Sequence, residues 1–448
     1  MRTADYLRDA VASVLPAVRA DLECLVRIPS VSADPAARPH LQASAEEVAR
    51  QLGKAGLPDV TIATADSGLP AVIGYRPGAP GAPTVLLYAH HDVQPVGDLS
   101  EWDSEPFEPV ERGGRLYGRG AADDKAGIAA HCAALRALGS DPGVAIAVLV
   151  DGEEEIGSPT LGALLAEHRE RLSADVLVLA DSTNWQVGVP ALTTSLRGGV
   201  NVVVEVRTLR HALHSGVYGG PTPDALMALS RLLATCHTDA GDVAVEGLGR
   251  GTADPLDLTE EKFRADAGIL DGVALLGTGS LTSRLWQAPA LSVLAIDAPA
   301  VDDAGLLLVP RARARLTLRI APGDDAVAAS KALVAHLRAH APWGAEVTVT
   351  AGRPVASYAA DTTGPAYAAA RSAYAEAFGE PVVEIGVGGS IGFVAPFAEA
   401  FPAAEILITG VEDPDTRAHG PNESLHVADF SSVCLAEALL LERLGAGL

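Results

Sequence analysis

The sequence predicts a doubly wound α/β protein with a mostly parallel sheet. A second domain, with a different pattern of polar and apolar residues, is inserted into it. Short apolar runs alternate with helical patterns up to about residue 192 and again from 355, as in a parallel sheet covered by helices on both faces. From 193 to 354 the strand-like segments alternate polar with apolar residues instead, which indicates a half-buried sheet. A chain of 448 residues is long enough for two cores. We therefore predict one domain in two parts, 1–192 and 355–448, with 193–354 inserted between them.

The individual elements follow from the spacing of apolar residues. A helix over 4–27 ends at Ile28-Pro29, because proline cannot continue it. The other helices of the first domain are expected at 41–55, 124–138, 158–168, 365–378 and 428–444, and its buried strands at 84–89, 144–150, 176–179 and 405–409. The inserted domain should contain strands at 200–206 and 311–320, a helix at 223–233, and a long excursion over 238–290.

Composition excludes several classes of protein. A formal net charge of −24 argues against a nucleic-acid partner, because phosphate binding requires a basic patch. The acidity alone indicates only a solvated surface. The four cysteines are scattered without a C-x-x-C pair, which argues against a zinc ribbon or a disulfide framework. No apolar run approaches the length of a membrane span, so we expect no membrane partner and a cytoplasmic protein.

His90 and Asp92 follow the predicted strand 84–89 and are two residues apart, so they share one face. Asp92 can accept the second imidazole N–H of His90, an arrangement that orients metal-ligating histidines. Strand-end capping explains this pair equally well. His91 should point the other way.

Further carboxylates follow the next predicted elements. Asp123 and Asp124 begin a helix, where acidic residues also serve as ordinary caps; Asp123 could instead bridge two cations with its two oxygens. The segment 151–157 places three successive glutamates at a strand end, where they repel one another unless cations, protons or solvent compensate them. Asp181 follows the strand 176–179, and His419 lies in a loop near the C-terminus.

Together these residues supply two imidazoles and several carboxylates, mostly at the carboxyl ends of predicted parallel strands, where α/β sites gather. Mixed nitrogen and oxygen ligation suits Zn²⁺, with Mn²⁺ or Co²⁺ as alternatives. Two such cations lower the pKa of a shared water towards about 7 and generate a hydroxide nucleophile. The sequence therefore predicts a hydrolase with two divalent metal ions.

These motifs and their order along the chain resemble those of the di-metal aminoacylase, carnosinase and carboxypeptidase-G family of metallopeptidases. Within that family, the chain is most similar to the cytosolic non-specific dipeptidases. The resemblance implies that His90 and Asp181 bind one metal and that Asp123 bridges both. The resemblance further implies that His419 binds the second metal and that Glu155 is a metal ligand. It also implies that Asp92 orients His90 and that Glu154 is the general base, which leaves Glu153 as an extra carboxylate.

The resemblance extends to the inserted domain, which it implies to be an α+β, ferredoxin-like lid and dimerisation domain. His214, in a His-Ser-Gly segment, is similar to the family histidine that reaches into the neighbouring subunit's site and stabilises the oxyanion. A homodimer follows from that role. The alternative for His214 is a turn residue before Gly216.

Three residues match the family's substrate-binding positions. Arg319 corresponds to the arginine that contacts a substrate carboxylate, although its strand also carries other arginines typical of a solvent face. Gly389 and Ser390 belong to a Gly-Gly-Ser-Ile segment similar to the family's substrate loop. The chain departs from the pattern where Gly392 replaces a proline and where Gly386-Val387 replaces an arginine and an acidic residue, and this loss of a cation puts strict dipeptidase specificity in doubt.

We therefore expect metal-dependent hydrolysis of an amide bond in a small substrate, a dipeptide or an N-acyl amino acid, with Glu154 carrying the proton. Deacylation or desuccinylation on the same site is the alternative within enzymes. A peptidase-like binding or dimerisation module without catalysis is the alternative of another class, and such relatives typically lose ligands that this chain retains.

Overall fold

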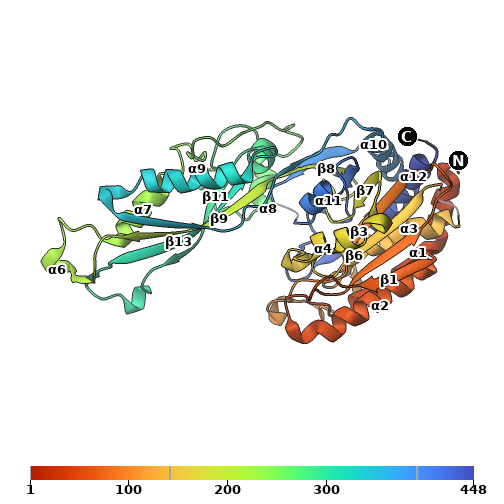
Figure 1. Ribbon diagram of the computed structural model, residues 1–448, viewed down its shortest axis with the longest axis horizontal. Helices are drawn as coiled ribbons and strands as arrows, with labels where there is room; N and C mark the ends of the chain where they lie inside the picture. The colour runs from red at the N-terminus through yellow and green to blue at the C-terminus, as the bar shows by residue number, and fades with distance from the viewer. Residues whose placement is uncertain (1, 141–142, 390–391, 448) are drawn as a thin grey trace. The chain divides into compact units, whose positions relative to one another are not determined.

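The computed structural model describes residues 2–140, 143–389 and 392–447 and divides into two compact units (Figure 1). Unit 1 comprises Met1–Thr194, Ala360–Ile385 and Gly392–Leu448, and unit 2 comprises Ser195–Ala359 and Gly386–Ile391. Within the described residues, no helix combines the length and the apolarity that crossing a bilayer requires.

Unit 1 is built on a mixed sheet in the order β1-β2-β6-β3-β7-β17-β8. The strands are β1 (Asp59–Ala63), β2 (Ala71–Arg76), β3 (Thr84–His90), β6 (Ala145–Asp151), β7 (Val176–Leu179), β8 (Ala191–Leu196) and β17 (Glu405–Ile408). Strand β3 runs parallel to both β6 and β7, and β17 runs parallel to β7, whereas β1, β2 and β8 pair antiparallel at the two sides. The mostly parallel sheet predicted from the sequence is confirmed, with antiparallel additions at its edges.

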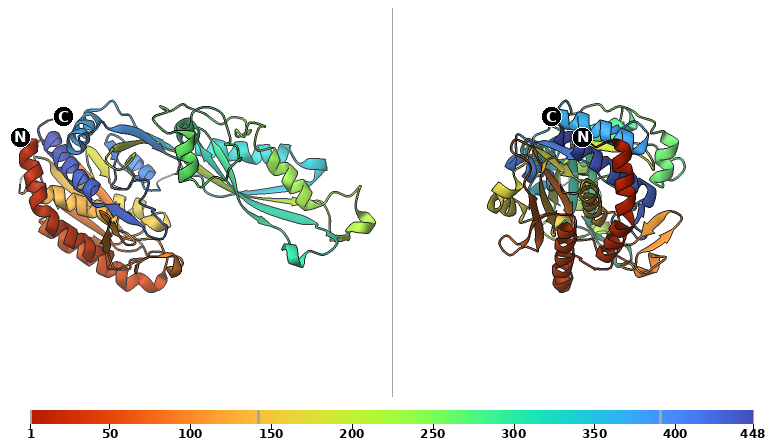
Figure 2. Two further views of the ribbon diagram at one scale, coloured as in Figure 1. Left: turned by 180° about the vertical axis from the view of Figure 1, so that it is seen from behind. Right: turned by 90° about the vertical axis from the view of Figure 1, so that its right-hand side faces the viewer.

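Helices cover both faces of this sheet (Figures 1 and 2). They are α1 (Ala4–Val26), α2 (Arg38–Lys54), α3 (Lys125–Leu138), α4 (Leu161–Glu167), α5 (Arg169–Leu172), α10 (Pro365–Phe378), α11 (Val394–Ala400) and α12 (Val427–Gly445). The middle of strand β3 is apolar because its side chains are buried on both faces of the sheet. Leu87 packs into the core shared with α3 and α12, while the next residue, Tyr88, places its ring 4.3 Å from Phe393 and 5.1 Å from Phe397 of α11.

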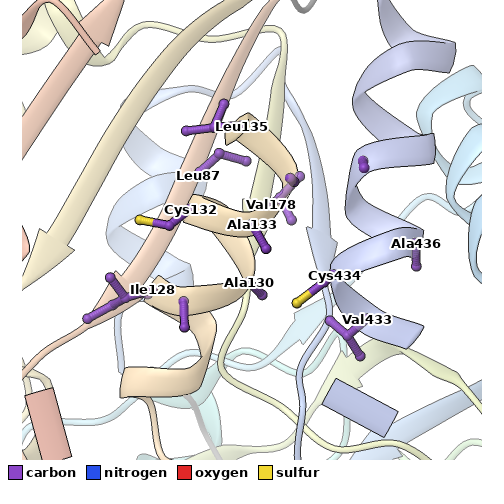
Figure 3. Packing of buried hydrophobic residues seen from close by; sticks show 14 of the residues in the cluster. Leu87, Ile128, Ala130, Cys132, Ala133, Leu135, Val178, Val433, Cys434 and Ala436 are labelled. Atoms are coloured by element: carbon purple, nitrogen blue, oxygen red, sulfur yellow. The ribbon is translucent and has the colours of Figure 1, made fainter. Parts of the chain in front are cut away.

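The core between the sheet and helices α3 and α12 is closely packed (Figure 3). Ile128, Cys132 and Leu135 of α3 lie among Leu87 of β3 and Val178 of β7, and the labelled side chains of α12 complete the cluster. Cys132 and Cys434 are buried free thiols, in agreement with the absence of a disulfide pattern. The chain ends of unit 1 meet, since Arg2 Nη1 lies 2.7 Å from Glu442 Oε2 (Figure 2).

Unit 2 contains a four-stranded antiparallel sheet in the order β11-β13-β9-β14. Its strands are β9 (Gly198–Arg207), β11 (Ala290–Asp297), β13 (Arg311–Ile320) and β14 (Glu346–Ala351), with α7 (Ala225–Ala234) and α9 (Ala326–Ala339) as the crossing helices. The chain order β-α-β-β-α-β with this strand order is the ferredoxin-like arrangement. Residues along β13 alternate between exposed and buried up to Leu316, as the alternating sequence predicted.

Small elements complete the chain. Strands β4 (Val110–Arg112), β5 (Arg115–Tyr117) and β18 (Ser424–His426) form a three-stranded sheet in unit 1. In unit 2, β10 (Leu213–His214) pairs with β12 (Leu307–Leu308), and α6 (Ser215–Tyr218) follows β10. The segment 238–290, left unassigned from sequence, contains α8 (Glu260–Asp266) and a π-helical turn over Ser283–Gln287. Strands β15 (Tyr358–Ala359) and β16 (Val383–Val387) pair with β8.

Candidate metal centre

The carboxyl ends of parallel strands bring the first residues of the centre together. His90 is the last residue of β3 and pairs in register with Asp151, the last residue of β6. His90 Nδ1 lies 3.0 Å from the main-chain oxygen of Asp92 and 3.5 Å from its carboxylate. His91 points away, with Nε2 2.8 Å from the carbonyl oxygen of Pro70, and burial lowers its pKa to about 4, so it is neutral.

Asp92 has a second contact that residue spacing could not reveal. Its two carboxylate oxygens accept the backbone N–H groups of Glu154 and Glu155, at 3.2 and 3.1 Å. One buried carboxylate therefore contacts the imidazole of His90 and fixes the turn that carries both glutamates.

Asp123 lies at the middle of the centre. Its Oδ1 is 3.0 Å from His90 Nε2, and its Oδ2 is 3.1 Å from His419 Nε2. Asp124 is the N-cap residue of α3, which begins at Lys125, but its side chain makes no capping hydrogen bond to the helix, so the interpretation of this carboxylate as a cap is wrong. Its carboxylate instead accepts the backbone N–H of His90 at 3.2 Å, and Gly127 is required beside it because a Cβ there would lie 2.4 Å from Asp124 Oδ1.

The acidic residues after β6 form two groups. Some of their carboxylates accept hydrogen bonds from the surrounding loops, and others face the centre. Asp151 accepts the backbone N–H groups of Gly152 and Glu153, at 2.7 and 3.1 Å. Glu153 accepts the backbone N–H of Leu69 at 2.6 Å and the hydroxyl of Thr160 at 2.8 Å. The carboxylate that was extra in the sequence pattern thus holds the loop.

Glu155 faces the centre, with Oε2 3.2 Å from His419 Nε2 and 2.7 Å from the amide nitrogen of Gln94. Its other oxygen is buried and has no hydrogen-bond partner among the described residues. A buried, unpaired carboxylate oxygen is costly unless something binds it.

Asp181 lies two residues after β7, with Oδ2 3.9 Å from His90 Nε2. A further carboxylate, Glu412, comes from the segment after β17, where it forms a parallel bridge with Thr183. Burial and the nearby carboxylates of Asp123 and Asp181 raise the pKa of Glu412 well above its usual range. The sequence reasoning missed Glu412, although the rule that sites gather at strand ends applies to β17 as well.

His419 reaches the centre from an irregular loop in which its own φ is 63°. A buried residue nearby, Glu423, was also missed. Its carboxylate accepts the backbone N–H groups of Gly120, Ala122 and Asp123, at 3.0, 3.0 and 3.2 Å, and pairs with Arg119 Nη1 at 2.6 Å. Glu423 therefore ties the loop that carries Asp123 to the loop that carries His419.

Two groups of potential ligand atoms result, and they share Asp123. One group is His90, Asp123 and Asp181, and the other is Asp123, Glu155 and His419, with the ligand atoms of each group within 4.8 Å of one another. Imidazole and carboxylate ligands suit zinc-type cations, and the buried, unpaired oxygen of Glu155 is suited to bind a cation. The structure thus brings together all five residues that the sequence suggested as metal ligands.

The charges of these groups are strongly coupled. Burial, with the Asp181 carboxylate next in importance, raises the pKa of Glu154 to about 9. Burial raises the pKa of Asp181 to about 7. Hydrogen bonds to Asp123 and Glu155 raise the pKa of His419 to about 11. At neutral pH, bound protons therefore offset part of the negative charge of the acidic cluster.

Cation binding should release protons, because His419 must be neutral to ligate. A pKa of about 11 for His419 means that it is protonated at pH 7, so we expect at least one proton released per chain and an affinity that rises about tenfold per pH unit. Zn²⁺ titration calorimetry in two buffers of different ionisation enthalpy measures this release. His419→Gln should release about one proton fewer, and an unchanged proton count in that variant would contradict the assignment.

The remaining predicted residues belong to unit 2. His214 is exposed, and its Nδ1 accepts the backbone N–H of Gly216 at 3.0 Å, so it caps the short helix α6. Arg319 is half-buried on β13, between Gly199 and Ala290 of the neighbouring strands. Gly389 is described, whereas Ser390 lies outside the described residues. The catalytic or substrate-binding roles of these four residues stay predictions.

Comparisons with known proteins agree with one another. The family described as Peptidase family M20/M25/M40 matches residues 86–443. The chain is 37% identical over 407 residues to the cysteinylglycine-S-conjugate dipeptidase of Corynebacterium striatum, covering 89% of each. It is 26% identical over 454 residues to the Cys-Gly metallodipeptidase DUG1 of Saccharomyces cerevisiae, covering 94% of each. The structure of human carnosine dipeptidase 1 aligns over 99% of both chains, with a TM-score of 0.79 and 24% identity.

Proposed function

The chain belongs to the peptidase family M20/M25/M40, and from this premise we propose how its residues carry out the metal-dependent hydrolysis of dipeptides. Its relatives at 37% and 26% identity are metallodipeptidases or dipeptidases by name, and the chain is a metal-dependent dipeptidase. The observation that supports this most directly is the pair of ligand groups joined at Asp123.

His90 and Asp181 would hold one cation and Glu155 and His419 the other, with Asp123 shared between them. When bound, two divalent cations polarise the scissile carbonyl and acidify a water molecule. Zinc suits these ligands best, with manganese and cobalt as alternatives.

Glu154 is the proton carrier in this scheme. It lies on the same turn as Glu155, belongs to neither ligand group, and its backbone is held by Asp92. Burial raises its pKa to about 9, and nearby cations would lower that pKa again, towards the range in which a carboxylate both accepts and returns a proton. Glu154 takes the proton from the attacking water and gives it to the leaving amine.

Unit 2 would serve as lid and dimerisation domain, bounded near residues 193 and 354. In a homodimer, the exposed His214 would stabilise the oxyanion in the neighbouring subunit's site. Arg319 would contact the substrate carboxylate, together with Gly389 and Ser390 of the substrate loop.

A substrate panel tests the function. Purified protein loaded with Zn²⁺, Mn²⁺ or Co²⁺ should cleave unmodified dipeptides such as L-alanylglycine with a higher kcat/KM than N-acetyl or N-succinyl amino acids. Release of free amino acids, measured by chromatography, is the readout. Faster cleavage of the N-acyl substrates would favour a deacylase, and absence of hydrolysis with all three metals would favour a non-catalytic module.

A further inference from the structure

Unit 2 contains a pocket with a volume of about 310 Å³. Its walls come from the end of β9 and the loop after it, from the segment that leads into α7, and from the turn before β14. None of these residues belongs to the metal centre, and all of them lie in unit 2. The volume is at the lower end of the range for small-molecule sites, so the pocket suits a compact ligand.

One wall of the pocket is positively charged. Arg207, the last residue of β9, and Arg210, in the loop after it, both line the pocket. The carbonyl oxygen of Pro310 holds this loop, since it accepts the backbone N–H groups of Thr208 and Leu209, at 3.1 and 3.4 Å. Thr208 also lines the pocket, and its hydroxyl oxygen is buried without a hydrogen-bond partner among the described residues. A buried, unsatisfied hydroxyl is costly unless a ligand or water binds it.

The cross-strand neighbours of Arg207 carry charges of both signs. Its register partner is Arg311 on β13 and Glu346 on β14. Like charges directly opposite each other destabilise a sheet. Glu346 does not offset this repulsion through an ion pair, because in the part of the chain that the structure describes no ion pair joins it to an arginine. Glu346 lines the pocket too, so a positive and a negative charge are both available to a ligand there.

An aromatic ring completes the pocket. Trp343 lies in the turn Pro342–Gly344, where its φ of 53° is a left-handed conformation that a bulky residue rarely adopts. The backbone N–H of Ala345 closes this turn by donating to the carbonyl oxygen of Pro342 at 3.0 Å. The guanidinium carbon of Arg231, on α7, lies 5.1 Å from the centre of the Trp343 ring. Trp343 is nevertheless 59% exposed, which leaves aromatic surface for an apolar group to pack on.

We propose that this pocket binds a free α-amino acid with an apolar or aromatic side chain. The carboxylate of such a zwitterion fits Arg207 and Arg210, because guanidinium groups bind carboxylates through paired hydrogen bonds. The hydroxyl of Thr208 can donate to the same carboxylate. Glu346 would pair with the ammonium group, and Trp343 would pack against the side chain. The site takes no part in hydrolysis, although the cleavage of a dipeptide releases molecules of this class.

Titration calorimetry of the full-length, Zn²⁺-loaded protein tests the proposal with two probes, L-phenylalanine and 3-phenylpropionate, which lacks the ammonium group. Arg207→Gln and Arg210→Gln should each raise the Kd for both probes by about tenfold, the effect typical of losing one charge-assisted hydrogen bond. Glu346→Gln should raise the Kd for L-phenylalanine by about threefold, since an exposed ion pair is screened by solvent. It should leave the Kd for 3-phenylpropionate unchanged.

Arg315→Gln is the matched control, because Arg315 is an exposed arginine of the adjoining strand β13 that does not line the pocket. Its Kd values should equal those of the wild type. Unchanged Kd values in Arg207→Gln and Arg210→Gln would place the bound probe elsewhere and overturn the proposal. Absence of saturable binding of either probe at millimolar concentration would do the same. Equal weakening of both probes by Glu346→Gln would overturn the assignment of an amino acid as the ligand.

Discussion

Replacing Glu154 by glutamine should lower kcat by about 10²- to 10⁴-fold, the contribution typical of a general acid–base residue. Glutamine has the shape of glutamate but cannot carry a proton between water and the leaving amine. Because Glu154 belongs to neither ligand group, the metal content of the variant should equal that of the wild type. Steady-state kinetics and elemental analysis on the same preparation measure both quantities.

The control for this variant is Glu167→Gln, which changes an exposed glutamate at the end of α4 and should leave kcat unaltered. The pH profile adds a second readout. The acidic limb of kcat/KM should report the carboxyl group of Glu154 in the loaded enzyme and should disappear in Glu154→Gln. Wild-type activity in a metal-loaded Glu154→Gln variant would show that Glu154 is not the general base.

Asp123→Asn should have the largest effect on metal binding, because Asp123 is the residue shared by both ligand groups. The amide removes one negative charge and offers only one ligating oxygen, so the affinity for at least one cation should fall by more than about hundredfold, beyond the effect of changing an outer residue. Activity should fall with it. Elemental analysis after dialysis should find fewer than two bound cations per chain.

Asp415→Asn is a suitable comparison, since Asp415 is an exposed aspartate in the loop that leads to His419. Its metal content should match that of the wild type. Circular dichroism should show Asp123→Asn folded in the absence of added metal. A variant that still binds two cations with unchanged affinity would show that Asp123 does not bridge.

The sequence predicted the sheet of unit 1 well because its central strands are buried on both faces and are therefore apolar without interruption. Strand β3 and helix α3 fall within about one residue of their predicted bounds. Strand β1 was missed because a half-exposed edge strand carries less pattern, and the short buried strand β2, which lies between β1 and β6, was missed as well. Across 238–290, turns and exposed residues leave almost no periodicity, although the structure has a helix at Glu260–Asp266.

His90, Asp123, Glu155 and Asp181 could be found from the sequence because each lies near the end of a predicted strand or the start of a predicted helix. His419, in an irregular loop, carries no such signal. Asp92 was predicted as the residue that orients His90, but the backbone contacts of Asp92, Glu153 and Glu423 could not be found from the sequence. Their carboxylates are anchored by backbone N–H groups of residues distant in sequence, such as Leu69 for Glu153. Backbone donors have no sequence signature, so only the folded chain reveals which acidic residues hold loops and which face the centre.

The position of β17 inside the sheet of unit 1 determines the order in which the protein can be completed during synthesis. This strand, Glu405–Ile408, lies between β7 and β8, and His419 follows it along the chain. The sheet of unit 2 uses strands only from residues 198–351. As a ribosome delivers the chain from its N-terminus, the inserted unit can close its sheet while the surrounding unit still lacks a central strand. The second ligand group therefore forms only after more than nine-tenths of the polypeptide has emerged.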